Sequence, residues 1–131
     1  MSQAPTHPPA LPKDFLRSCL LLLLREDPAH GYELLERAAQ LGFDRGDAGG
    51  LYRTLRRLEH DGAVRSAWEP SASGPQRRIY EITRGGMEEL HSRAKALVEG
   101  ASQVERFLGR YEEFVSVRSS RTESALARRS P

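Results

Sequence analysis

The sequence predicts a mainly α-helical fold with one small β-hairpin, in the order helix, helix, helix, hairpin, long helix. Residues 13–62 hold apolar residues at helical spacing, interrupted by two loops. Residues 63–83 change to an alternation of apolar and polar residues around a turn signal. From Thr83 onward the apolar residues return to helical spacing over four heptads. With 131 residues, the chain can form one modest core with additional terminal segments.

Positive charge is distributed unevenly along the chain, although the net charge is only +2. Residues 48–84 carry 7 Lys or Arg against 4 Asp or Glu, and residues 118–131 carry 4 against 1. Residues 13–47, by contrast, carry 5 against 7. This distribution favours a polyanionic partner that docks on one region of the protein over a uniformly basic surface.

The composition argues against several classes of protein. The single cysteine, Cys19, lies in an apolar run and is expected to be a small core residue, so a disulfide framework is excluded. That run is far shorter than the roughly 20 residues that span a bilayer, and Arg25 follows where a secretory signal needs small residues. No metal-ligand spacing relates the four histidines, His7, His30, His60 and His91.

No nucleophile, base and orienting acid form a recognisable catalytic signature in the sequence. We therefore expect a protein that is not an enzyme, has no metal or other cofactor, and has no membrane partner. A reduced, cytoplasmic compartment is the expected location.

Both ends of the chain are expected to be disordered. Residues 1–12 are Pro-rich and lack an apolar period, which is typical of an extended or disordered arm. Residues 118–131 read as a disordered basic tail.

The first two helices are expected to form most of the core. Residues 13–25 are apolar on most sides, which indicates a helix buried at the centre of the fold, and Asp27-Pro28 ends it. A second helix begins at His30 and closes at Gly42. Gly31 near its start is expected to let two helices pack closely. The residues expected to face inward are Tyr32, Leu35 and Ala39, with Leu34, Ala38 and Leu41 as further candidates.

The third helix, within residues 49–62, carries leucine on one side and arginine on the other. Asp47 is well placed to cap its N-terminus. A projection at 100° per residue gathers Leu51, Leu55 and Leu58 on one stripe, which should pack on the first two helices. The opposite side carries Gly49, Arg53, Arg56, Arg57 and His60.

The hairpin follows this helix. Residues 63–70 and 77–83 alternate apolar and polar side chains, and Gly74-Pro75 between them is a turn signal. Trp68, in the first strand, is expected to pack under the hairpin. Arg77 and Arg78 follow this turn, and formation of the turn does not itself require charged side chains there.

The last helix is expected to run from about Thr83 to Val117 and to carry a coiled-coil seam. Gly100 and Gly109 each cost about 1 kcal/mol in a helix interior, so a bend or break near Gly100 is one expectation. On so small a chain the seam would be exposed, which predicts a homodimer held by this helix with help from the first. The seam consists of Met87, Leu90, Ala94, Leu97, Ala101, Val104, Leu108, Tyr111 and Val115. Its expected dimer contacts are Leu90, Leu97, Ala101, Val104, Leu108 and Tyr111.

The order of the elements is that of a winged helix-turn-helix domain, residues 13–84, followed by a long C-terminal dimerisation helix, residues 85–117. The arginine face of the third helix can enter a DNA major groove, where guanidinium forks match guanine edges or phosphates. Three arginines on a helix are more often solvated surface. The second basic element, at Arg77 and Arg78, favours double-stranded DNA as the partner.

Three segments resemble the PadR family of transcriptional regulators, over about residues 15–95. They are LLLLREDPAHGYELLERAAQLGF, LYRTLRRLEHDGAVRSAWE and SGPQRRIYEIT, with GG following the last. The resemblance is specific because the HGYEL, LY-x-x-L-R-R-L-E and GP-x-R-R-x-Y-x-x-T blocks occur together and in order. It implies a homodimeric, usually repressing, DNA-binding protein whose C-terminal helix supplies much of the dimer contact. The ending VERFLGRYEEF further resembles the polyhydroxybutyrate-responsive repressor subgroup.

By the family pattern, Tyr52 would lie at the DNA backbone and Arg53 and Arg56 near the groove. Arg77 and Arg78 would lie on the wing. Many family members carry a hydroxyl residue where this chain has Gly50, so backbone N–H groups would have to replace a hydroxyl contact to phosphate. Gly49 would let the helix start approach a phosphate closely, and Arg57 would mainly meet phosphate.

The two symmetry-related helices of a dimer predict an inverted-repeat operator. Release by a small-molecule effector of unknown identity is left open. The alternative is a protein-interaction module, in which the heptad helix binds another protein and the arginines only keep the chain in solution.

Overall fold

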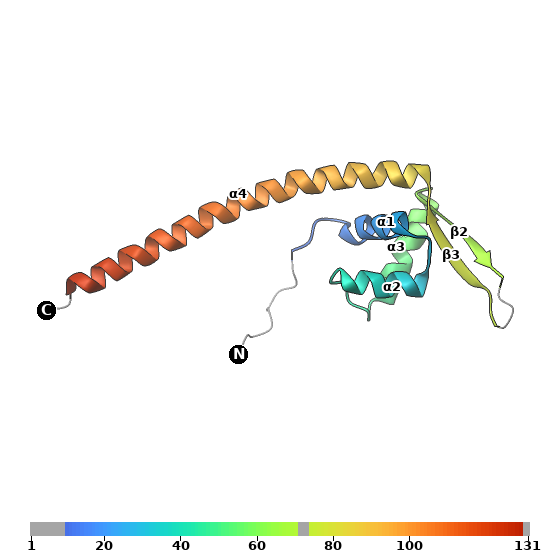
Figure 1. Ribbon diagram of the computed structural model, residues 1–131, viewed down its shortest axis with the longest axis horizontal. Coiled ribbons are helices and arrows are strands. Elements are labelled where there is room, and N and C mark those ends of the chain that lie inside the picture. Colours follow the sequence, from blue (N-terminus) through green and yellow to red (C-terminus); the bar gives the residue numbers. More distant parts are fainter. Residues whose placement is uncertain (1–9, 71–73, 130–131) are drawn as a thin grey trace. The chain divides into compact units, whose positions relative to one another are not determined.

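The computed structural model has the predicted order of elements, with one additional short strand (Figure 1). It describes residues 10–70 and 74–129, with side chains described up to residue 118. The elements are α1 (Phe15–Glu26), β1 (Ala29–His30), α2 (Gly31–Gln40), α3 (Ala48–His60), β2 (Val64–Glu69), β3 (Arg77–Ile82) and α4 (Arg84–Arg129). The predicted N-terminal arm, 1–12, lies outside the described residues except for 10–12. The chain divides into two compact units, residues 1–94 and 95–131.

The sheet is antiparallel, with the strand order β1-β3-β2. The β2–β3 pair is the predicted hairpin, in which Val64 lies opposite Ile82 and Glu69 opposite Arg77. Strand β1 was not predicted from the sequence, because two residues are too few to show an alternation. It pairs His30 with Ile79 and so ties the start of α2 to the hairpin.

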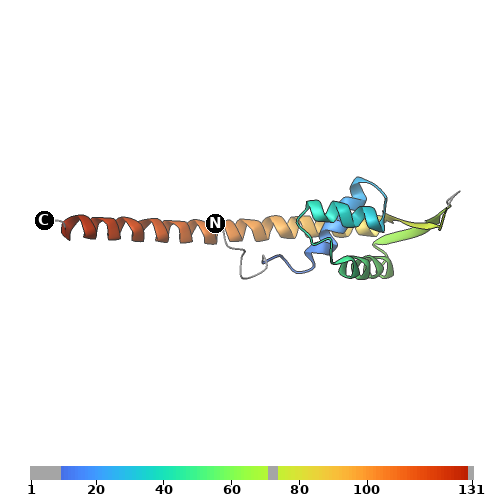
Figure 2. The same ribbon diagram turned by 90° about the horizontal axis from the view of Figure 1, so that it is seen from below.

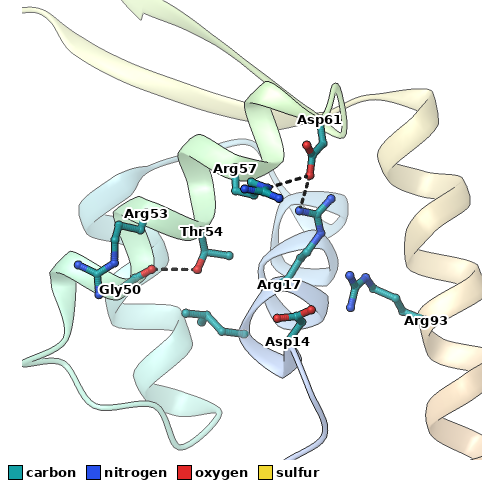
Figure 3. A pocket seen from close by; sticks show the side chains of 9 residues that line it. Asp14, Arg17, Gly50, Arg53, Thr54, Arg57, Asp61 and Arg93 are labelled. Atoms are coloured by element: carbon teal, nitrogen blue, oxygen red, sulfur yellow. Dashed lines mark hydrogen bonds and ion pairs between the residues drawn. The ribbon is translucent and has the colours of Figure 1, made fainter.

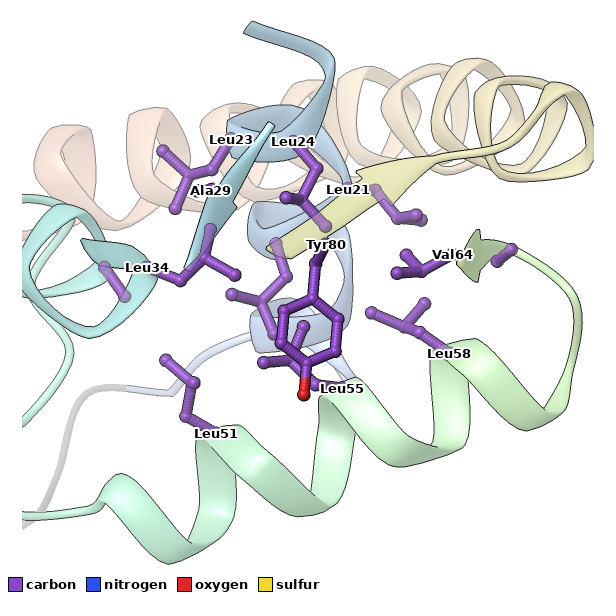
Figure 4. Packing of buried hydrophobic residues seen from close by; sticks show 13 residues of the cluster. Leu21, Leu23, Leu24, Ala29, Leu34, Leu51, Leu55, Leu58, Val64 and Tyr80 are labelled. Carbon is purple, nitrogen blue, oxygen red and sulfur yellow. The ribbon is translucent and has the colours of Figure 1, made fainter. Parts of the chain in front are cut away.

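The core is formed by side chains of α1, α2, α3 and the sheet that meet at one centre (Figure 4). Helix α1 buries several of its residues there, as its apolar sequence predicts, and it ends where Asp27 turns extended before Pro28. Cys19 is buried as expected, and this burial raises the pKa of its thiol. The leucine stripe of α3 is fully buried, and Tyr80 of β3 closes the core on the sheet side.

The inward face of α2 differs in part from the prediction. Leu34 and Ala38, both named as candidates, are buried, and Leu35 packs partly against the core, as predicted. Tyr32 and Leu41, however, are about half exposed, at 52% and 47%. The reason is that Gly31 faces α3: a Cβ at this position would lie 2.5 Å from the ring of Tyr52. This close approach of α2 to α3 turns Tyr32 away from the core, and it confirms the expected role of Gly31 in helix packing.

The hairpin extends beyond the core. Val64, at its base, is buried, whereas Trp68, on the same face of β2, is 58% exposed. The prediction that Trp68 packs under the hairpin is therefore wrong, because no core side chain reaches that far along the strand. The guanidinium of Arg78 lies over the indole ring instead, 5.4 Å from its centroid.

Helix α4 begins near the predicted Thr83, whose hydroxyl accepts from the N–H of Gly86 and donates to the carbonyl of Gly62. A Cβ at Gly86 would lie 2.1 Å from the carbonyl oxygen of Ala63, so only glycine fits where α4 starts against the end of α3. The helix runs without a break from Arg84 to Arg129, through Gly100 and Gly109 (Figure 2). The break expected near Gly100 is therefore absent, although each glycine costs about 1 kcal/mol in a helix interior.

The predicted end of this helix is also corrected. It continues past Val117 to Arg129, through residues that the sequence analysis assigned to a disordered tail. The physical reason is composition: alanine, leucine and arginine near its end are strong helix formers, and residues 84–130 contain no proline. Among the described residues, no helix has the length and apolar character needed to cross a membrane.

Candidate nucleic-acid interface

Helix α3 is held in place by its buried leucine stripe and by a cap at its start. The carboxylate of Asp47 accepts from the N–H of Gly50 at 3.1 Å, which confirms Asp47 as the N-cap. A Cβ at Gly50 would lie 2.3 Å from that carboxylate, so a side chain at this position would require the Asp47 carboxylate to shift. Because the leucines face inward, the opposite side of α3 is presented to solvent.

Arginines dominate that exposed side. Arg53, Arg56 and Arg57 are exposed, as are Gly49 and His60. Within the described part of the chain, Arg53 and Arg56 have no ion-pair partner, and Arg57 has only a long contact of 3.8 Å with Asp61. Their guanidinium groups are therefore available to an anionic partner.

Tyr52 lies at the edge of the same face. It is only partly exposed, because its ring packs on Gly31 at the start of α2. The Tyr52 ring is thus held between α2 and α3, the two helices of the helix-turn-helix. In the sequence, Tyr52 stands between the buried Leu51 and the exposed Arg53.

Both wing arginines are held by neighbouring groups, which the sequence did not foresee. Arg78 donates to Ser66 at 2.7 Å and to Glu59 of α3 at 3.2 Å, and Ser66 in turn donates to Glu59 at 2.6 Å. This network joins the hairpin to α3.

Arg77 contacts a different helix. Its guanidinium lies over the ring of Tyr32 of α2, 5.5 Å from the centroid, and donates to the Tyr32 hydroxyl at 3.2 Å. The two adjacent arginines of β3 are thus fastened to two different helices.

A groove of about 790 Å³ lies beside α3, between α1 and the first turns of α4 (Figure 3). It is lined by Asp14, Leu16, Arg17, Gly50, Arg53, Thr54, Arg57, Asp61 and Arg93. Arg53 and Arg57 therefore belong both to the exposed face of α3 and to this groove. The Thr54 hydroxyl donates to the carbonyl of Gly50 at 2.9 Å, so its proton is already used.

Arg17 forms the base of the groove and joins three helices. It donates two hydrogen bonds to Glu89 of α4, at 2.6 and 2.8 Å, and one to Asp61 after α3, at 2.8 Å. Arg93 also donates to Glu89, at 2.6 Å. The two guanidinium groups lower the pKa of Glu89 to about 2, and the carboxylates raise the pKa of Arg17. In the sequence, Arg17 is visible only as a charge within an apolar helix.

His30 caps α2, as the sequence predicts for a helix-start residue. Its ring and backbone N–H both contact Glu33, three residues on. Within the residues that the structure describes, no group of three or more His, Cys, Asp or Glu side chains could hold a metal ion.

The seam residues of α4 differ in exposure. Leu90 packs partly against the core of its own chain, and Leu97 is partly buried. Further along, Ala101, Val104, Leu108 and Tyr111 are exposed, together with Phe107 and Phe114 beside the seam. In the unit from residue 95 onward, the described side chains thus present an apolar stripe to solvent.

Comparisons of this sequence and structure with known proteins show which proteins the chain resembles. A comparison with curated protein sequences found no significant match. A PadR-like transcriptional regulator from Bacillus cereus is 25% identical, with a TM-score of 0.63 over 73% of this chain and 93% of that one. A conserved protein of unknown function, described as a potential transcriptional factor, is 35% identical, with a TM-score of 0.69 over 78% and 91%.

A third structure, Bacillus subtilis PadR in complex with operator DNA, is 24% identical. Its TM-score is 0.55 over 61% of this chain and 46% of that one, a likeness of fold. The profile of the transcriptional regulator PadR-like family matches residues 20–92, from α1 to the first turns of α4. This match covers more than half of the chain and takes in all or part of every element of the winged helix-turn-helix, so the chain belongs to the PadR-like family of transcriptional regulators.

Proposed function

We propose that this chain is a sequence-specific DNA-binding regulator that represses transcription as a homodimer on an inverted-repeat operator. The observation that carries the proposal is the exposed face of α3, where Arg53 and Arg56 have no partner within the described chain. Unpaired guanidinium groups on a helix whose other side is fixed in a core are suited to the major groove.

In this proposal Arg53 and Arg56 reach base edges, while Arg57, further round the helix, contacts phosphate. Tyr52 lies at the DNA backbone, where its ring is already fixed against Gly31. The N–H of Gly50 donates to Asp47, so a phosphate at the helix start would meet the N–H of Gly49.

The wing contributes contacts to the DNA backbone in this proposal. Arg77 and Arg78 lie exposed on β3, next to the turn. Glu59 offsets part of the charge of Arg78. Arg77 has no carboxylate partner among the described residues and is the stronger candidate for a phosphate contact.

The homodimer is supported by the exposed apolar stripe of α4, which a second copy of the same helix would cover. Two copies of α3 would then face successive major grooves about 34 Å apart, which explains the expected inverted repeat. The Bacillus subtilis protein, which has the same fold, was solved in complex with operator DNA, and this supports DNA as the partner in this proposal. A regulator of this kind would act in the cytoplasm. We assign no effector to it.

The test begins with selection of bound duplexes from a random DNA pool. Binding of Arg53→Ala, Arg56→Ala and Arg57→Ala is then measured on the selected operator and on a scrambled duplex at one salt concentration. Loss of a bidentate base contact is expected to cost about 1 to 3 kcal/mol on the operator, with a smaller loss on the scrambled duplex. Arg57→Ala should weaken binding to both duplexes alike.

Arg25→Ala is the matched control, because Arg25 is exposed on α1 and outside this face. If Arg53→Ala and Arg56→Ala lower both affinities by the same factor, α3 grips only the backbone and DNA shape carries the specificity. If no duplex is selected and binding does not weaken as salt rises, the interaction-module alternative replaces this proposal.

A further inference from the structure

The outer end of the wing is fastened to the start of α2 by a histidine between two carboxylates. His30 Nδ1 lies 2.6 Å from Glu33 Oε1, and Nε2 lies 2.7 Å from Glu69 Oε2. Glu33 belongs to α2, whereas Glu69 is the last residue of β2. The ring of His30 thus connects a helix start to the end of a wing strand.

The opposite strand of the wing is held at the same place by Tyr32. The phenol ring stacks on the His30 ring, with centroids 5.6 Å apart and planes 9° apart. The guanidinium of Arg77 also lies over the Tyr32 ring, 5.5 Å from its centroid, and donates to its hydroxyl. Glu69 and Arg77 face each other as the outermost pair of the hairpin, so both strands are attached at their ends.

This attachment matters because the hairpin has no core beneath it there. Val64 is buried at the base, while residues from Ala67 to Glu69 and the facing Arg77 and Arg78 are exposed. An isolated two-stranded hairpin is only marginally stable in water. The direction of its outer end therefore depends on side chains that connect it to the helices: the contacts to α2 at Glu69 and Arg77, and nearer the base the Arg78–Glu59 contact to α3.

We propose that His30 and Tyr32 are positioning residues for DNA binding, which hold the outermost wing pair, Glu69 and Arg77, in the place where Arg77 meets a phosphate. This inference rests on the proposed function. We call the five residues His30, Tyr32, Glu33, Glu69 and Arg77 the wing clasp.

The wing clasp depends on the charge of His30. A protonated ring has two N–H donors and can satisfy Glu33 and Glu69 together, whereas a neutral ring has one donor and leaves a lone pair facing a carboxylate. The groups that face His30 are Glu33 and Tyr32 from α2, Glu69 from β2 and, through the Tyr32 ring, Arg77 from β3.

The pH window follows from these partners. Glu33 first, and then Glu69, raise the pKa of His30, and His30 lowers the pKa of Glu33. The contacts that need a protonated His30 ring are fully formed at pH values below the ordinary pKa of histidine. They are lost as the pH rises through the raised pKa of His30. The contacts that need ionised Glu33 are lost only as pH falls through its lowered pKa.

The first experiment compares Glu69→Gln with Glu81→Gln in binding to the selected operator at about pH 6, where His30 is charged. Both changes remove one negative charge from the wing, but Glu81 pairs with Arg65 and does not touch α2. Electrostatics alone would tighten DNA binding equally in both variants. The clasp predicts that Glu69→Gln binds about two- to fivefold more weakly than Glu81→Gln, the size of one partly exposed charge pair.

The second experiment uses His30→Asn, because asparagine caps helices well but is too short to bridge Glu33 and Glu69. The wild type is expected to lose more operator affinity than His30→Asn between about pH 6 and about pH 8.5, since the other histidines remain in both. A residue that only caps α2 would leave the two pH profiles parallel, and parallel profiles overturn the proposal.

A readout without DNA separates this proposal from the proposed function. Hydrogen exchange of the backbone amides of residues 69 and 77 is expected to be faster in Glu69→Gln than in Glu81→Gln. Fluorescence anisotropy of Trp68, the single tryptophan, reports the same loosening of the wing. If the wild type binds no duplex, the proposed function fails whatever the exchange rates are. If the wild type binds DNA and the two variants match in affinity and exchange, only the clasp is overturned.

Discussion

Helices α3 and α4 carry apolar stripes of similar spacing, yet the two stripes end in opposite environments. In α3, Leu55 and Leu58 are completely buried within the unit formed by residues 1–94. In α4, Val104, Leu108 and Tyr111 remain 46 to 56% exposed. The first stripe completes a core of its own chain, whereas the second presents a surface that a second chain can cover.

This difference separates two kinds of stability. The stability that the buried stripe of α3 contributes should be independent of protein concentration, since its contacts lie in the same chain. The stability that the seam of α4 contributes should depend on protein concentration, because two chains must associate to bury the seam. Changes placed in the two stripes can therefore test the distinction directly.

The largest effect is expected from Leu55→Ala. The side chain is fully buried among leucines of α1 and α3, and truncation of a core leucine costs about 2 to 5 kcal/mol. Urea unfolding followed by circular dichroism should show this loss at every protein concentration. Leu41→Ala is the control, because Leu41 is about half exposed, and its cost should stay below about 1 kcal/mol. Equal losses in the two variants would contradict the assignment of the core.

A smaller but concentration-dependent effect is expected from the double change Leu108→Ala, Tyr111→Ala. It removes two seam side chains and should raise the dimer dissociation constant about tenfold to a hundredfold. Sedimentation velocity measures this constant. Val98→Ala serves as the control, because Val98 is exposed on α4 outside the seam. A chain shortened to end at Ala94 that stays as dimeric as the full chain would show that the seam is not the interface.

The smallest of these effects concerns the contact between α1 and the start of α4, which both lie in the unit formed by residues 1–94. Glu89 has a pKa of about 2 because of Arg17 and Arg93. Its stabilising contribution is present above the ordinary glutamate range and is lost as pH falls toward about 2. Allowing for partial exposure, Glu89→Gln should cost about 1 to 2 kcal/mol at neutral pH and little at the acidic end.

The measurement is the free energy of unfolding of wild type and Glu89→Gln as a function of pH. Glu88→Gln, on the same turn of α4 but exposed, is the matched control. Wild-type and Glu89→Gln curves that stay parallel from neutral pH into acid would contradict the role given to Arg17.

The sequence predicted the features that depend on local pattern. The leucine stripe of α3, the Asp47 cap and the hairpin all follow from spacing and from residue type, and all are confirmed. The inward face of α2 was predicted only in part: Leu34, Leu35 and Ala38 contact the core, whereas Tyr32 and Leu41 are half exposed. Apolar residues occur on a wide arc of that helix, and the approach of Tyr52 to Gly31 decides which of them face inward.

The features that the sequence did not predict depend on residues distant in the chain. Arg17 meets Glu89, Arg78 meets Glu59, and His30 meets Glu69 only because the fold brings them together. Trp68 was expected to pack under the hairpin because of its place in the first strand, but the strand carries it past the last core side chain. The family pattern pointed to the arginines of α3 and the wing without showing which of them are already paired.

The contact between Asp47 and Gly50 constrains the order in which mutations can accumulate at the start of α3. The Asp47 carboxylate occupies the space that any side chain at position 50 would need. A serine or threonine there would displace the carboxylate from its cap, at a cost of about 1 kcal/mol. Gly50→Ser should therefore be harmful in this background and nearly neutral once Asp47 has been replaced. The two positions are expected to change together over evolution, with position 47 changing first.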